Sequence, residues 1–63
     1  MREYYILAGF RDDNDLLDYR YYNGLEFTHN YDESKIYSLK DLSRIIMEVY
    51  LIFNPEIITI YKR

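Results

Sequence analysis

Apolar residues recur at alternate positions along four segments of the chain, which is the period of a β-strand. Residues 4–10 and 56–62 are apolar at both sets of alternate positions, so both strands are predicted to be covered on both faces, with the first in the centre of a sheet. Residues 16–22 and 25–29 are apolar on one side and polar on the other, as in a half-exposed hairpin. A short extended piece is expected at residues 36–37.

The apolar period changes to three and four residues over positions 39–53, which predicts an amphipathic helix. Ser38 and Asp41 have the spacing of a capping box at its start, and Pro55 disfavours helical backbone at the residue before it. The predicted core stripe of this helix consists of Leu42, Ile45, Ile46, Val49 and Phe53, with Leu39 and Tyr50 at its flanks.

The turn of the predicted hairpin can be built in two ways. A two-residue Asn23-Gly24 turn would place Tyr22 opposite Leu25 and put charged side chains on the apolar face. A three-residue loop, residues 22–24, with Gly24 in the left-handed conformation pairs Tyr21 with Leu25 and keeps the two faces separate. Because a one-residue slip exchanges the faces of a strand, we predict the three-residue loop.

These elements predict a single α+β domain over residues 1–63, with the order β-β-β-α-β and a mixed four-stranded sheet. The helix is expected to return the chain so that the last strand runs parallel to the first, in the spatial order last-first-second-third. One helix packed on one face leaves the other face apolar and open, which monomers seldom tolerate. We therefore expect a homodimer or a protein partner, with self-association through Tyr5, Leu7, Met47, Leu51, Ile58 and Ile60. A sheet that curls on itself and buries both faces is the alternative.

The formal charge of −3 is unevenly distributed along the chain. Residues 12–33 contain seven acidic residues and one base, Arg20, which gives a formal charge of −6, and the rest of the chain carries +3. A lobe of one sign attracts partners of the opposite sign, so we expect a protein target with a basic surface. The predicted contact residues in the acidic turns are Asp12, Asp13, Asp15, Asp18, Asp32 and Glu33. An ordinary solvated surface is the alternative interpretation.

The residue types that catalysis or a cofactor would need are scarce. The chain has no cysteine, one histidine (His29) and two glycines, so zinc sites and phosphate-binding loops are disfavoured. The acidic run from Asp12 to Asp18 lacks the glycine and the glutamate of an EF-hand loop. We predict a protein that is not an enzyme and binds neither cofactor nor metal. A cytoplasmic location without a membrane segment is expected, because cysteine is absent and Glu3 and Glu48 interrupt the apolar runs.

Nine tyrosines in 63 residues suit both a half-buried sheet and a contact surface. Tyr5, Tyr19, Tyr21 and Phe27 could form a platform on which single-stranded bases stack. The acidic charge argues against this, because phosphate binding relies on dense basic patches. Nucleic acid is therefore disfavoured as a partner, and a single-stranded nucleic-acid binder is kept as the alternative function.

Most of the chain follows a frame of short segments, namely Tyr4-Tyr5-Ile6, Tyr21-Tyr22-Asn23-Gly24-Leu25-Glu26-Phe27-Thr28, Lys35-Ile36-Tyr37-Ser38, a short helix and Glu56-Ile57-Ile58. This frame resembles small accessory proteins of phages and prophages of Gram-positive bacteria. Proteins of that kind often inhibit host or defence enzymes, among them anti-CRISPR proteins, acidic DNA mimics and the phage inhibitor of uracil-DNA glycosylase. The resemblance implies an inhibitor that acts in the host cytoplasm by blocking a surface of its target. A structural subunit of a larger assembly is a further alternative.

Overall fold

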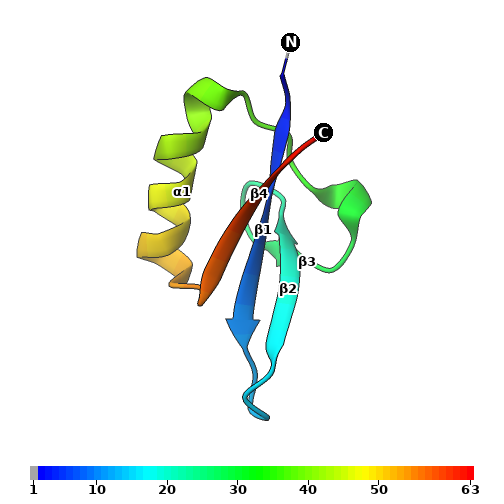
Figure 1. Cartoon of the computed structure of the whole chain (residues 1–63), viewed down its shortest axis with the longest axis vertical. Helices are drawn as coiled ribbons and strands as arrows, with labels where there is room; N and C mark the ends of the chain where they lie inside the picture. The colour runs from blue at the N-terminus through cyan, green and yellow to red at the C-terminus, as the bar shows by residue number, and fades with distance from the viewer. Residues whose placement is uncertain (1) are drawn as a thin grey trace.

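The computed structural model describes residues 2–63, and it contains a four-stranded sheet and one long helix (Figure 1). The predicted α+β class and the predicted order of elements are confirmed. A single 3₁₀ turn, η1, is added between the third strand and the helix. In chain order the elements are β1 (Tyr4–Arg11), β2 (Leu17–Tyr22), β3 (Phe27–Thr28), η1 (Tyr31–Glu33), α1 (Leu39–Phe53) and β4 (Ile57–Lys62).

The sheet has the strand order β3-β2-β1-β4, so the predicted order and the central place of β1 are confirmed. All three pairings are antiparallel, and the predicted parallel pairing of the last strand with the first, and with it the mixed sheet, is wrong. The reason is the path of residues 29–38. After β3 this segment returns to the start of β1, where Tyr37 exchanges two backbone hydrogen bonds with Tyr4 (2.7 and 2.9 Å). α1 therefore runs in the direction of β1, and β4 comes back against it (Figure 1).

The register of the hairpin between β2 and β3 differs from both predicted turns. Tyr22 pairs with Phe27 and Tyr21 pairs with Thr28, so the connecting loop has four residues. The predicted pairing of Tyr21 with Leu25 is wrong. The consequence is that Tyr22 points into the core and is 5% exposed, whereas the loop residue Leu25 lies in solvent.

The Asn23 side chain explains why a four-residue loop forms. Its Oδ1 accepts hydrogen bonds from the backbone N–H groups of Leu25 (2.9 Å) and Glu26 (2.8 Å). The Asn23 N–H in turn donates to the Glu26 carbonyl (3.0 Å), which closes the loop. Gly24 has a φ of +101°, so its predicted left-handed backbone is confirmed inside this longer loop.

α1 begins and ends at the predicted residues. At its start the Ser38 hydroxyl donates to the Asp41 carboxylate (3.1 Å) instead of accepting from backbone, so the capping box does not form. At its end Asn54 adopts left-handed backbone (φ 50°) and its N–H donates to the Tyr50 carbonyl (3.1 Å). Pro55 follows and is buried, which fixes the connection to β4.

The hydrophobic core joins α1 to the sheet. Its buried members are Ile6, Tyr22, Tyr37, Leu42, Ile45 and Val49, and the half-buried Ile46, Phe53, Ile58 and Ile60 pack against them. Three residues of the predicted helix stripe are thus buried and two are half-buried, while the flanking Leu39 and Tyr50 lie at the surface. The remaining strand residues alternate to the opposite face, beside which η1 lies (Figure 1).

Candidate interaction surfaces

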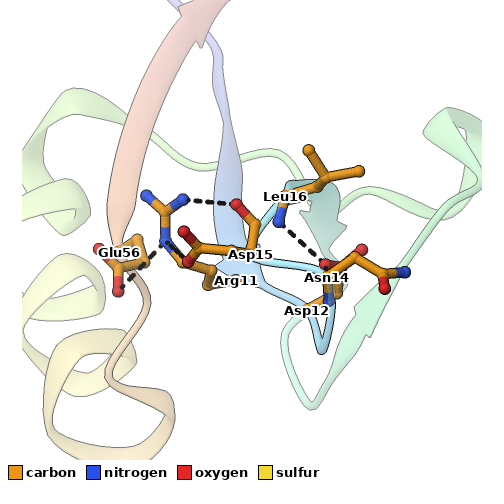
Figure 2. Close-up of polar contacts among 6 residues, drawn as sticks. All are labelled: Arg11, Asp12, Asn14, Asp15, Leu16 and Glu56. Atoms are coloured by element: carbon orange, nitrogen blue, oxygen red, sulfur yellow. Dashed lines mark hydrogen bonds and ion pairs between the residues drawn. The ribbon is translucent and has the colours of Figure 1, made fainter.

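The first acidic turn connects β1 to β2 and is closed by its own carboxylate (Figure 2). Asp12 Oδ1 accepts hydrogen bonds from the backbone N–H groups of Asn14 and Leu16, both at 2.9 Å. Such local bonds are the usual reason for aspartate in turns. Asp12 therefore has a structural role, while the Asp13 side chain makes no hydrogen bond or ion pair with any residue between positions 2 and 63.

Arg11 ties this turn to the connection between α1 and β4 (Figure 2). Its Nε lies 3.5 Å from Asp15 Oδ1 and 3.8 Å from Glu56 Oε1, and its Nη1 donates to the Asp15 carbonyl (2.9 Å). Asp15 itself has left-handed backbone with a φ of 63°. All three side chains are largely exposed, so these ion pairs orient the turn more than they stabilise the fold.

Asp18 lies on β2 and not in a turn, and two side chains engage its carboxylate. Arg20 Nη2 approaches its Oδ2 to 2.7 Å, and His29 Nε2 lies 2.9 Å from its Oδ1. These hydrogen bonds, first the one with His29 and then the one with Arg20, lower the pKa of Asp18 below its ordinary value. The carboxylate is thus neutralised locally, which weakens its value as a contact for a basic partner.

The second acidic group, Asp32 and Glu33, belongs to η1. Glu33 Oε1 accepts from the Thr28 hydroxyl (2.7 Å), and the Asp32 N–H is capped by Asn30 Oδ1 (3.0 Å). η1 sits beside Tyr5 near the start of β1, whereas the first turn follows the end of β1. Six strand residues at about 3.4 Å each separate the two groups by roughly 20 Å. The predicted acidic residues therefore form two separate patches, and contact with a partner stays a prediction for both.

A tyrosine cluster occupies the sheet face opposite the core. The Tyr5 ring stacks on Tyr61 (5.5 Å between centroids) and lies 6.1 Å from Tyr21, and Tyr31 of η1 packs edge-on against Tyr5 (5.2 Å) and Tyr21 (5.5 Å). Burial among these rings raises the pKa of Tyr5. η1 thus covers part of the face that was expected to be open, and Tyr5 is half-buried.

The structure divides two of the predicted residue groups between opposite faces. Ile58 pairs with Ala8 and Ile60 pairs with Ile6, so both isoleucines face the core and do not join Tyr5 and Leu7. The register of β1 with β4 pairs residues of the same parity, so the β4 residues on the face of Tyr5 and Leu7 are Ile57, Thr59 and Tyr61. In the predicted base-stacking platform, Phe27 likewise lies on the core face, where its ring packs against Phe10, Tyr22 and Phe53.

Several large apolar side chains are exposed on the outer side of α1. Met47 and Leu51 were predicted to lie away from the core, and the structure confirms this with exposed fractions of 65% and 80%. Leu39 (61%), Ile52 (69%) and Tyr50 (44%) add to this surface, and sequence reasoning missed Ile52. Arg44 lies along it and pairs with Glu48 at 3.2 Å. We name Leu39, Met47, Tyr50, Leu51 and Ile52 the outer α1 surface.

Concave sites are shallow. One open cleft of about 410 Å³ is lined by Phe10, Arg20, Glu26, Phe27 and Phe53. A smaller cleft of about 150 Å³ lies beside η1, between Tyr31 and Arg63. In the part of the chain that the structure describes, no three His, Cys, Asp or Glu side chains meet in a way that could hold a metal ion.

None of the helices within residues 2–63 is long and apolar enough to cross a membrane. Comparison with protein-family models, with curated proteins and with solved structures returned no match. The resemblance to phage accessory proteins therefore stays a prediction from the residues alone.

Proposed function

We propose that this chain is a non-catalytic protein-binding module that docks on a partner through the outer α1 surface. One observation carries the proposal, namely the five large apolar side chains that this 15-residue helix leaves in solvent. A helix that only covers a sheet needs one apolar side. This helix has a second one, and apolar patches of that kind mark protein contacts.

The energetic argument favours the C-terminal half of the helix. Fully burying a side chain the size of Leu or Met contributes about 1.5–3 kcal/mol. Met47, Leu51 and Ile52 are each at least 65% exposed, so a partner could bury most of each side chain. A few such residues dominate the affinity of typical interfaces, because association itself costs several kcal/mol that they must offset.

The acidic turn at residues 12–15 would guide a basic partner towards this surface. Arg11 links Asp15 to Glu56, and Glu56 follows α1 after only two residues, so the turn and the end of the helix lie at the same end of the molecule (Figure 1). Charges at the rim of an interface mainly raise the association rate. In line with the resemblance above, we propose that the module inhibits its target by occupying a basic surface.

A pair of charge-matched variants tests the docking surface. Met47→Glu combined with Leu51→Glu adds two negative charges within the outer α1 surface, and Lys35→Glu changes the charge by the same amount in the connection that precedes the helix. A protein captured by the wild-type chain should be purified and titrated with both variants by calorimetry. We expect the first variant to lose at least 100-fold in affinity and the second to stay within threefold. Equal affinities for the two variants would refute the proposal.

The same partner allows a test of the acidic turn. Asp12, Asp13 and Asp15 are replaced together by Asn, which keeps the Oδ1 acceptor that Asp12 uses to close the turn. The association rate at low salt should fall and become less dependent on ionic strength, while the dissociation rate changes little. An unchanged association rate at low salt would contradict a steering role.

Single-stranded nucleic acid remains a second candidate because of one observation. Tyr19, Tyr31 and Tyr61 are all exposed on the face opposite the core, and Arg63 lies at the edge of the cleft beside Tyr31. Base stacking on tyrosine tolerates many sequences. Fluorescence anisotropy with an oligothymidine at 20 mM and 200 mM salt tests this. Salt-sensitive binding that Tyr61→Ala weakens would support it, and absence of binding at low salt would exclude it.

A further inference from the structure

β4 forms one edge of the sheet, and one side of its backbone is unpaired in the part of the chain that the structure describes. The hydrogen bond from the Arg63 N–H to the Glu3 carbonyl (2.8 Å) shows which residue pairs of β1 and β4 are hydrogen-bonded. Hydrogen-bonded pairs alternate with non-bonded pairs along an antiparallel ladder. The odd-numbered residues of β4 therefore direct their backbone groups towards β1. Those of Ile58, Ile60 and Lys62 point away from the sheet.

This edge lacks the features that usually prevent strand pairing. Protective devices include proline, a bulge or a charged residue within the strand. Here Pro55 precedes the strand, and Lys62 is its last residue, so the five positions between Ile57 and Tyr61 are uncharged. The opposite edge differs, because β3 has only two residues. β4 is therefore the edge that could accept another strand.

We infer that β4 pairs with β4 of a second copy of this chain, antiparallel and about a two-fold axis at Thr59. The sequence Glu56-Ile57-Ile58-Thr59-Ile60-Tyr61-Lys62 is self-complementary about that residue. Ile58 then faces Ile60 of the partner, Ile57 faces Tyr61, and Glu56 faces Lys62. A two-fold interface uses the same surface on both copies, so each pair occurs twice. The inference is independent of the proposed docking of α1.

Each pair in this register is favourable on its own face of the sheet. On the core side, Ile58 and Ile60 extend the apolar layer across the interface, and a Glu56–Lys62 ion pair closes both ends. On the opposite side, Thr59 lies opposite Thr59 of the second copy, and Tyr61 packs over Ile57. Thr–Thr pairs and aromatic–β-branched pairs across two strands both stabilise antiparallel sheets. Lys62 makes no ion pair with residues 2–63 of its own chain, whereas Glu56 lies 3.8 Å from Arg11 Nε, so Lys62 of the partner would share the Glu56 carboxylate with Arg11.

Charge complementarity selects this register over its neighbours. Only shifts by two residues preserve the outward hydrogen-bonding groups and the two faces. An axis at Ile60 would place Lys62 opposite Ile58, and an axis at Ile58 would place Glu56 opposite Ile60. Both shifts set a charge against an isoleucine and remove the ion pairs. The strand thus complements a second copy of itself, which is why we choose a homodimer over an unrelated peptide strand.

Cysteine cross-linking reads the register directly, because the chain contains no cysteine. Thr59 would form a non-hydrogen-bonded pair with its own copy, with Cα atoms about 4.5 Å apart, a separation within the range of a disulfide. We expect Thr59→Cys to give disulfide-linked dimers in mild oxidant at least tenfold faster than Ser43→Cys on α1. Ile57→Cys and Tyr61→Cys should cross-link poorly alone and readily when mixed, because these positions face each other.

A charge exchange tests the ion pairs by light scattering over a concentration series. Lys62→Glu should weaken the dimer about tenfold, since it sets like charges opposite each other at both ends. Glu56→Lys combined with Lys62→Glu should restore it, and Lys40→Glu on α1 should leave it unchanged. A chain that stays monomeric up to millimolar concentration would overturn the inference. So would a dimer in which Thr59→Cys cross-links no faster than Ser43→Cys.

Discussion

Gly9 in the central strand should not tolerate even one added methyl group. A Cβ built at this position would lie 2.8 Å from Ile57 Cγ2 and 3.1 Å from Tyr19 Cε1, both closer than ordinary van der Waals contact. Ile57 is β-branched, so its Cγ2 cannot swing away without a change of χ1. Overpacking of this kind costs about 1–3 kcal/mol. Alanine regains about 0.5–1 kcal/mol over glycine in a strand interior. We expect Gly9→Ala to lower the free energy of unfolding by about 1 kcal/mol.

Urea unfolding at one fixed protein concentration measures this loss, and a double-mutant cycle assigns its cause. Ile57→Ala removes the clashing Cγ2, so Gly9→Ala in that background should cost about 1 kcal/mol less than in the wild type. Gly24→Ala is the control, because its cost arises from a φ of +101° and does not involve Ile57. If Gly9→Ala leaves stability unchanged, or costs as much with Ile57→Ala as without it, the steric argument is refuted.

Three further predictions concern single side chains. Asn54→Ala should lower the free energy of unfolding by about 1 kcal/mol, because alanine resists the left-handed backbone at the end of α1, whereas Asn54→Gly should be nearly neutral in the same urea assay. Burial raises the pKa of Tyr37 to about 12, so stability should fall as pH rises above 10, where the unfolded chain loses this proton first; Tyr37→Phe should flatten the fall. The pKa of Asp18 is lowered in the folded chain, so the unfolded chain takes up this proton first and stability should decline as pH drops below 3.8. Asp18→Asn should remove that part of the acid dependence, which circular dichroism can follow.

The elements that were predicted well are those whose signals are local. α1 could be bounded to the residue because its apolar period is continuous and Pro55 follows it. The central place of β1 followed from its two apolar sets of positions, one of which enters the core with Ile6 while the other carries Tyr5. Neither inference needs to know where the rest of the chain goes.

The direction of β4 could not be predicted, because it depends on a segment without periodicity. Residues 29–38 form no regular strand, yet the two backbone bonds between Tyr37 and Tyr4 decide at which end of the sheet α1 begins. The hairpin register failed for a related reason. It depends on two hydrogen bonds from the Asn23 side chain, and asparagine before glycine is equally compatible with shorter turns.

For the candidate sites, too, composition could be read from the sequence but the contacts between side chains could not. A formal charge of −6 over residues 12–33 suggested one acidic surface, but local contacts use much of it. Asp12 closes its own turn, Asp18 is paired with Arg20, and Glu33 accepts a bond from Thr28. The exposed residues of α1 were easier to foresee, because Met47 and Leu51 fall outside the core stripe by spacing alone.

The self-complementarity of β4 is a property of the sequence that has meaning only in a particular sheet. The pairs Glu56–Lys62, Ile57–Tyr61 and Ile58–Ile60 can be read directly from the chain, but in a central strand they would be irrelevant because both edges would be occupied. Strand order and direction together turn the pattern into a surface, since they leave the outward backbone groups of Ile58 and Ile60 without a partner in the chain that the structure describes. An interface of this kind is found by asking first which edge is free, and only then what sequence lies along it.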